Sequence, residues 1–156
     1  MMAQISAVVL VVMTTLTQQQ GTGEEIAPQN MNLTQAQEMF KQTYKELDLN
    51  HDLLVDLREF MEPYLKHDHD NNMAVTLAEF LQQAPAEENQ EILTSDFRFH
   101  DQNHDDVISV PEMQSQFSNI DTDENKEITE AEFIAYGTKL FTEKSHPSFQ
   151  QPPVGK

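Results

Sequence analysis

The segment from Asp48 to Phe60 reads DLNHDLLVDLREF, with oxygen-bearing side chains at alternate positions and a glutamate near its end. A tight turn could gather Asp48, Asn50 and Asp52 around one cation, with Glu59 closing the site. Position 6 of the segment is Leu53, although a sharply turning loop favours glycine there. The alternative is an acidic surface turn that binds nothing, and the rest of the chain distinguishes the two.

The same pattern occurs three more times, as DHDNNMAVTLAEF from Asp68, DQNHDDVISVPEM from Asp101 and DTDENKEITEAEF from Asp121. Every copy has Asp at position 1, Asp or Asn at positions 3 and 5, and Glu at position 12. Position 8 is β-branched and apolar in each copy: Val55, Val75, Ile108 and Ile128. Four copies in the same frame make a chance match a poor explanation.

These positions are the ligand positions of the EF-hand calcium loop, and the chain resembles the EF-hand superfamily over residues 34–137. Calcium takes six to eight hard oxygens, which alternate side chains, one backbone carbonyl and a bidentate glutamate supply together. The resemblance implies an all-α domain of helix–loop–helix units with Ca²⁺ as its cofactor. Its four calcium loops, called loops 1 to 4, span residues 48–59, 68–79, 101–112 and 121–132.

The resemblance also implies the metal ligands, which occupy positions 1, 3, 5, 7, 9 and 12, with a backbone carbonyl at position 7. In loop 1 they are Asp48, Asn50, Asp52, Leu54, Asp56 and Glu59. In loop 2 they are Asp68, Asp70, Asn72, Ala74, Thr76 and Glu79. In loop 3 they are Asp101, Asn103, Asp105, Val107, Ser109 and Glu112. In loop 4 they are Asp121, Asp123, Asn125, Glu127, Thr129 and Glu132.

The spacing of the loops departs from that family. They start at residues 48, 68, 101 and 121, so each outer pair is separated by only 20 residues. This interval leaves room for one helix, which the two loops of an outer pair must share. Because a helix of about ten residues is about 15 Å long, the loops at its two ends cannot pair side by side. We therefore expect loop 2 to pair with loop 3 through Val75 and Ile108, and loop 1 to pair with loop 4.

Apolar and aromatic residues precede each loop with the spacing of one helical face, at positions −1, −4 and −8. They are Leu47, Tyr44 and Phe40; His67, Tyr64 and Phe60; His100, Phe97 and Leu93; and Ile120, Phe117 and Met113. We expect these side chains to form the core. A capping box of Thr34 and Gln37 is expected to begin the first helix, and Gly137 to end the last one.

The two ends of the chain have a different character. The apolar run from Ala7 to about Leu16 predicts a signal peptide over residues 1–23 and hence a secreted protein; an uncleaved anchor or a buried helix is the alternative. Residues 24–33 form an N-terminal segment with the glycosylation sequon of Asn32. Residues 138–156 are expected to be a flexible tail because the segment contains three prolines, and it has no KDEL-like ending.

The charge of the chain restricts its partners. A formal net charge of −18 would repel phosphate backbones and anionic lipids, so nucleic acid is not expected. No membrane span is expected in the mature chain, because the apolar run from Ala7 to about Leu16 is too short to cross a bilayer as a helix. The periodic apolar residues favour a fold over the disorder that such a charge could otherwise indicate. Because the chain has no cysteine, bound metal is the staple that we expect to hold this small secreted domain together.

The sequence disfavours two other kinds of site. His51, His69 and His104 fall at loop positions that are not ligands, so a zinc or copper site is disfavoured. No nucleophile motif or glycine-rich phosphate loop is visible, and the chain is expected not to be an enzyme.

The sequence therefore predicts a secreted calcium-binding protein, acting as an extracellular calcium buffer or as an acidic structural or biomineral matrix component. Its expected partners are calcium ions and either a mineral surface or a matrix protein. A calcium sensor that binds a protein target, or a lumenal protein resembling reticulocalbin and calumenin, is the alternative. Few methionines disfavour the sensor, and the absence of a retention signal disfavours the lumen.

Overall fold

The computed structural model describes residues 31–82 and 90–143, which are mostly helical. Along the chain lie α2 (Leu33–Leu47), β1 (Val55–Asp56), α3 (Leu57–Leu65), β2 (Ala74–Thr76), α4 (Leu77–Gln82), α5 (Gln90–His100), β3 (Val107–Ser109), α6 (Val110–Ile120), β4 (Glu127–Ile128) and α7 (Glu130–Glu143). The predicted all-α class holds at this level, with minor strand content. The predicted signal peptide and most of the N-terminal segment lie outside the described residues.

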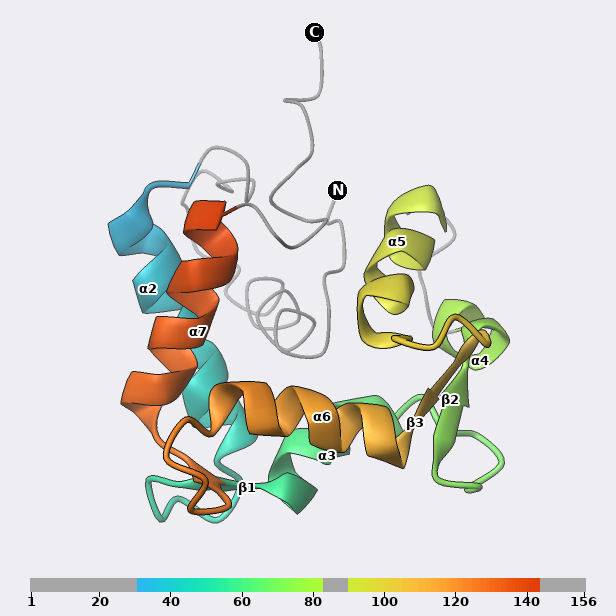
Figure 1. The fold of residues 1–156 in the computed structure, drawn as a ribbon, viewed down its shortest axis with the longest axis horizontal. Coiled ribbons are helices and arrows are strands. Elements are labelled where there is room, and N and C mark those ends of the chain that lie inside the picture. The colour runs from blue at the N-terminus through green and yellow to red at the C-terminus, as the bar shows by residue number, and fades with distance from the viewer. Residues whose placement is uncertain (1–30, 83–89, 144–156) are drawn as a thin grey trace, which may run out of the picture.

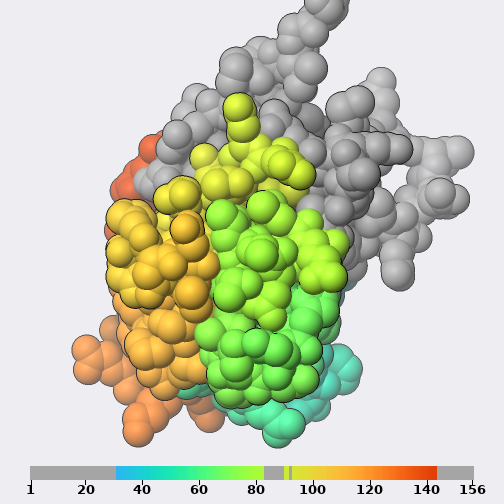
Figure 2. All heavy atoms as spheres, turned by 90° about the vertical axis from the view of Figure 1, so that its right-hand side faces the viewer, coloured from blue at the N-terminus to red at the C-terminus, as the bar shows by residue number. Residues whose placement is uncertain are grey.

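The strands form two antiparallel ladders, each between two loops. Val55 of β1 faces Ile128 of β4, and Val75 of β2 faces Ile108 of β3. Loop 1 therefore pairs with loop 4 and loop 2 with loop 3, which confirms the pairing predicted from the spacing. Figure 2 shows loops 2 and 3 side by side on one face of the molecule.

Helices α3 and α6 lie against each other and connect the two pairs of loops. The β1 ladder lies near one end of these helices, and the ladder of β2 and β3 lies at the other end (Figure 1). We call loops 1 and 4 with α2 and α7 the outer module, and loops 2 and 3 with α4 and α5 the inner module. Helices α3 and α6 belong to both modules, as the 20-residue intervals predicted.

The core forms where the predicted helical faces meet. All twelve residues at positions −1, −4 and −8 are buried, as are the four position-8 residues of the ladders. Edge-to-face and tilted ring pairs connect the helices, among them Phe60 with Phe117 at 5.7 Å and Tyr44 with Phe133 at 5.8 Å between centroids. This packing confirms the expected core, and it fixes the ends of the helices from which the loops project.

The first helix begins earlier than expected. Asn32 is its N-cap: the Asn32 side chain accepts a hydrogen bond from the Gln35 N–H at 3.0 Å, and the Gln35 side chain accepts one from the Asn32 N–H at 2.9 Å. The predicted capping box of Thr34 and Gln37 is therefore wrong by two residues. The asparagine side chain is at least as good a cap as threonine, and here it satisfies the first free backbone donors of the helix.

The last helix also extends further than expected. Helix α7 continues through Gly137 to Glu143, so the prediction that Gly137 ends it is wrong, and residues 138–143 are helical rather than part of a tail. A Cβ atom at residue 137 would lie 2.9 Å from the ring of Phe40. Glycine is present here because α2 approaches α7 closely, while buried Leu140 continues the apolar face beyond it.

Among the described helices, none has both the length and the apolar character that a membrane crossing requires.

Candidate metal centre

Each acidic loop turns through two residues with positive φ. At position 6 these are Leu53 (72°), Met73 (67°), Asp106 (62°) and Lys126 (73°), and at position 4 they are His51 (61°), Asn71 (58°), His104 (62°) and Glu124 (59°). The sequence predicted a sharp turn at position 6 without a glycine, and the positive φ values at this position agree. The sequence did not predict the positive φ at position 4. This position holds residues that adopt positive φ with little steric penalty in some loops and residues that do not in others.

The aspartate at position 1 anchors each loop to the end of the helix before it. In loop 1 the Asp48 N–H donates to the Tyr44 carbonyl at the end of α2, at 3.0 Å. Its two carboxylate oxygens accept hydrogen bonds from Asp52 N–H at 3.2 Å and Leu53 N–H at 3.1 Å. The equivalent bonds to positions 5 and 6 recur in all four loops. These bonds hold the chain in a turn around the first carboxylate.

The side chains at positions 3 and 5 close the same turn. The position-3 oxygen accepts from the position-5 N–H, and the position-5 oxygen accepts from the position-7 N–H, at 2.7–3.1 Å in all four loops. Positions 1, 3 and 5 thus face the inside of each turn. The position-7 residues Ala74, Val107 and Glu127 begin strands, and Leu54 directly precedes β1.

The glutamate at position 12 reaches back across each loop from the helix that follows. Glu59 is the third residue of α3, and Asp56 at position 9 is the N-cap of that helix. One oxygen of Glu59 accepts from Leu49 and Asn50 N–H at 3.0 and 3.1 Å, and the other accepts from Asp56 N–H at 3.1 Å. The glutamates of the other loops make the same bonds to positions 2 and 9. The carboxylate at position 12 therefore lies over the opening of the turn.

In each of two loops, the structure brings three predicted ligands together in one group. Carboxylate oxygens of Asp68, Asp70 and Glu79 in loop 2 all lie within 4.8 Å of one another, as do those of Asp121, Asp123 and Glu132 in loop 4. Loops 1 and 3 carry Asn50 and Asn103 at position 3, so they cannot form the same trio of acids. Their shared hydrogen bonds show the same local geometry.

Hydrogen bonds favour the ionised form of two position-12 carboxyls, those of Glu79 and Glu132. The backbone and the hydroxyl of Thr76 lower the pKa of Glu79. Partial burial raises the pKa of Glu132, but hydrogen bonds from Thr129 and Thr122 outweigh it and lower that pKa to about 2. A metal ligand has to be deprotonated, and these two carboxyls are anionic at neutral pH.

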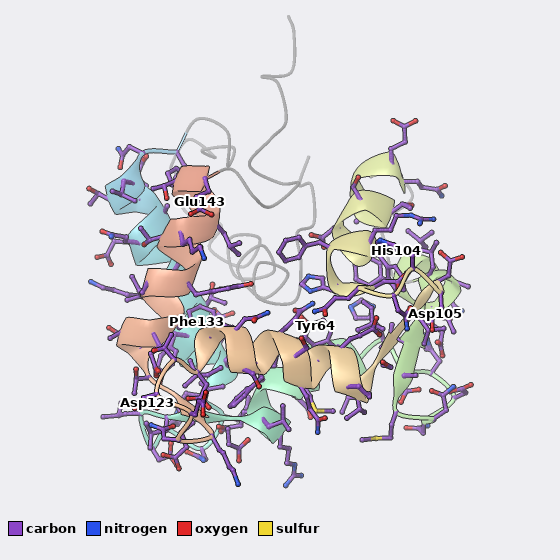
Figure 3. All side chains as sticks on the ribbon, viewed as in Figure 1. Tyr64, His104, Asp105, Asp123, Phe133 and Glu143 are labelled. Carbon is purple, nitrogen blue, oxygen red and sulfur yellow. The ribbon has the colours of Figure 1, made fainter. Side chains whose placement is uncertain are left out.

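Histidine does not join these groups. His51, His69 and His104 are exposed at positions 4, 2 and 4, whereas His67 and His100 are buried in the core. Neither acidic trio found in the described part of the chain includes a histidine. Figure 3 shows His104 and Asp105 in the loop between α5 and β3, and Asp123 in the loop that follows α6.

Tyr44 connects the two loops of the outer module, a role that the sequence did not suggest. Its hydroxyl lies 2.8 Å from the Leu53 carbonyl of loop 1 and 2.9 Å from the Ile128 carbonyl of loop 4, between two possible acceptors. The side chain is buried, and burial with the nearby charge of Asp48 raises the pKa of Tyr44 to about 12. Its place at position −4 before loop 1 predicted only that the side chain packs in the core.

Comparison with known proteins found no matching family model, no matching curated protein and no matching solved structure.

Proposed function

We propose that this chain is a secreted calcium-binding protein of the EF-hand type, with one Ca²⁺ site in each of loops 1 to 4. The observation that supports this best is the fourfold repetition of one oxygen-lined turn, with the same hydrogen bonds from the same positions. A surface turn that binds nothing has no reason to repeat this arrangement four times. The oxygens are hard ligands, which calcium prefers to nitrogen or sulfur.

The burial of these acids tests how well a cation fits. Asp48, Asp101 and Asp121 at position 1 are 4, 0 and 6% exposed. In the described part of the chain two salt bridges are found, Lys41 with Glu38 and Arg98 with Asp106, and neither involves a carboxylate at position 1 or 12. Burying a carboxylate without a cationic partner costs free energy, which a bound Ca²⁺ ion would offset. The donor set and its burial therefore fit calcium.

The backbone strain suggests weak binding. At position 6, where such a loop favours glycine, another residue at positive φ costs roughly 1–2 kcal/mol, which is about a tenfold loss of affinity for each loop. We expect dissociation constants of about 10⁻⁴ to 10⁻³ M, the range of extracellular modules. Such sites would fill in a compartment rich in calcium and stay empty in a resting cytosol, in agreement with the predicted secretion.

For the role of the bound calcium, we favour an extracellular buffer or an acidic matrix component over a sensor. Four Ca²⁺ ions would add eight positive charges and leave a net charge of about −10, so the protein stays anionic and able to meet a mineral face. A sensor has to swing its helices apart to expose a groove. Helices α3 and α6 are each joined to a loop at both ends, which opposes such a movement.

Calorimetric titration of the full chain with calcium tests the proposal. Four ions for each chain with dissociation constants near 10⁻⁴ to 10⁻³ M are expected. Magnesium at the same concentrations is the control, since it demands a stricter octahedral geometry and should bind more weakly. The absence of a binding signal up to about 10 mM calcium would contradict the proposed function.

Three further measurements distinguish the roles. Retention on calcium carbonate or calcium phosphate is expected for a matrix component. Calcium-dependent binding to a hydrophobic resin would favour the sensor instead. Retention in the microsomal fraction of expressing cells would favour the lumenal alternative over secretion into the medium.

A further inference from the structure

Helices α3 and α6 each carry predicted ligands of two different loops. Glu59 at the start of α3 belongs to loop 1, and Asp68 just after its end belongs to loop 2. Glu112 at the start of α6 belongs to loop 3, and Asp121, its C-cap, belongs to loop 4. Each helix therefore joins one loop of the outer module to one loop of the inner module.

The two helices are also bonded to each other through buried side chains. Phe60 of α3 packs edge-to-face on Phe117 of α6. One turn further along, the Tyr64 hydroxyl donates to the Gln116 side chain at 2.9 Å, and both residues are buried. Tyr64 lies over the middle of α6, between the two ends that carry the loops (Figure 3). This buried contact gives a route by which a change in the conformation of one helix can alter the other.

Neither helix is long enough to be stable by itself. Helix α3 has 9 residues with Pro63 inside it, and α6 has 11. Isolated helices shorter than about 12–15 residues are marginal in water, so α3 and α6 depend on packing and on the loops that fix their ends. If the two helices are partly unfolded without calcium, the module that binds calcium first bears the cost of ordering both of them. The second module then meets helices that are already formed, and it binds with a smaller entropic penalty.

We propose that α3 and α6 couple the two modules, so that calcium bound in either module raises the calcium affinity of the other. This coupling rests on the proposed function, because it concerns the same four loops. Within each module the β ladder joins two loops, and the shared helices join the ladders, so the four sites form a closed ring. The protein then fills as one unit of four sites and not as two independent pairs.

Nuclear magnetic resonance can follow each loop during a calcium titration of the full chain. The position-6 amides donate to the position-1 carboxylates, so Leu53 and Lys126 report on the outer module and Met73 and Asp106 on the inner one. The double substitution Glu59→Gln with Glu132→Gln disables the outer module. We expect it to raise the calcium midpoint of the Met73 and Asp106 amides about fivefold or more, the lower end of ordinary coupling between sites.

The reciprocal variant, Glu79→Gln with Glu112→Gln, should raise the midpoints of Leu53 and Lys126 by the same factor, because coupling of binding free energies is mutual. Smaller shifts in both directions overturn the coupling and leave calcium binding intact. If none of the four amides responds in the unmodified chain, calcium binding itself fails and the coupling falls with it.

A second variant keeps every predicted ligand and removes the Tyr64 hydroxyl, which donates to Gln116 of α6 and also lies 3.3 Å from His100 Nδ1. Two independent two-site modules cannot give a Hill coefficient above 2, so a value above 2 is expected for the unmodified chain and decides the question if the double variants do not fold. Tyr64→Phe should lower this coefficient, whereas Ser118→Ala on the exposed face of α6 should leave it unchanged. Equal coefficients in all three proteins would overturn the role of the α3–α6 contact.

Discussion

Leu53 combines two features that are unfavourable for a leucine. Its φ is 72° and its side chain is 77% exposed, so it neither suits the backbone nor contributes to the core. Its backbone is nevertheless fully used: the N–H donates to Asp48, and the carbonyl accepts from Tyr44. The turn at position 6 is therefore held by backbone contacts that any residue could make, and the side chain only adds strain.

We predict that Leu53→Gly tightens calcium binding at loop 1 by about fivefold to tenfold, because glycine removes roughly 1–2 kcal/mol of strain and keeps both hydrogen bonds. Leu49→Gly is the matched control, since Leu49 is also exposed in loop 1 but its φ is not positive. That control should not tighten binding. Calorimetry with both variants gives the comparison, and equal affinities for Leu53→Gly and the unmodified chain would show that position 6 carries no strain.

Glu59→Gln should nearly abolish calcium binding at loop 1. The amide keeps the shape of the side chain but loses the charge and one of two ligand oxygens that Ca²⁺ takes from a bidentate glutamate. The stoichiometry in calorimetry should fall by at least one ion. An unchanged stoichiometry and affinity would mean that loop 1 is not a calcium site.

A third residue-scale prediction concerns Tyr44. Tyr44→Phe removes the hydroxyl between loops 1 and 4 and should lower the free energy of unfolding by about 1 kcal/mol. The pKa of Tyr44 is raised from 10 to about 12, so its proton stabilises the fold below pH 10, and this contribution is lost as the pH rises to 12. Denaturant unfolding at pH 8 and pH 11 should show a larger alkaline loss for the unmodified chain than for the variant.

Position 4 shows where prediction from single residues fails. Its φ is positive in all four loops, yet the residues are two histidines, an asparagine and a glutamate. Asparagine and histidine are enriched at positive φ, so they gave only a weak signal, and glutamate gave none. The proposed ligand positions, in contrast, rest on a pattern in the sequence, because a hard cation would restrict its ligands to oxygen-bearing residues at fixed spacing.

At the scale of the helix, Gly137 of α7 packs closely against the ring of Phe40 in α2. We predict that Gly137→Ala destabilises the fold by about 1 kcal/mol or more, although alanine favours a helix by about 1 kcal/mol over glycine, because the new Cβ would overlap the Phe40 ring. Thermal unfolding measures this effect. In a double-mutant cycle, Phe40→Leu should remove most of the penalty of the added methyl group. Additive effects of the two substitutions would contradict the close contact.

The ends of the helices were less predictable than their faces. Asn32 with Gln35 and Thr34 with Gln37 offer the same capping pattern two residues apart, and the structure has the first. Gly137 resembled a helix end because glycine is common just after helices. The sequence around it does not reveal the Phe40 ring that lies against this residue. The buried faces were predictable, since a 3.6-residue period leaves little freedom once one side is apolar.

At the scale of the whole molecule, the intervals between loops determined the topology. Twenty residues between loop starts exclude two helices and force α3 and α6 to be shared, so the ladder partners follow from length alone. The lateral contacts between α3 and α6 could not be predicted in this way. Tyr64 meets Gln116 across 52 residues, and no pattern within either helix indicates that pair.

We predict that the protein loses much of its helix content without calcium. The chain has no cysteine, its net charge is −18, and its position-1 carboxylates are buried without a lysine or arginine partner among the described residues. Repulsion between these anions should leave the calcium-free form partly unfolded. Circular dichroism and thermal melts in chelator and in 10 mM calcium give the test. Identical spectra and midpoints in the two conditions would show that bound metal does not stabilise the fold.

The pairing of the strands is nested, with the inner ladder enclosed in sequence by the outer one, and nesting sets an order on folding during synthesis. The Tyr44 hydroxyl cannot have both of its acceptors until Ile128, 84 residues later in the chain, has been synthesised. At about 5–20 residues per second a ribosome needs roughly 4–17 s to make that length. Through this interval β1 has no strand to pair with and the acids of loop 1 have no completed module around them. Until β4 has been made, β1 therefore remains an unpaired strand edge, and the 20-residue spacing of the loops delays its completion until near the end of the described chain.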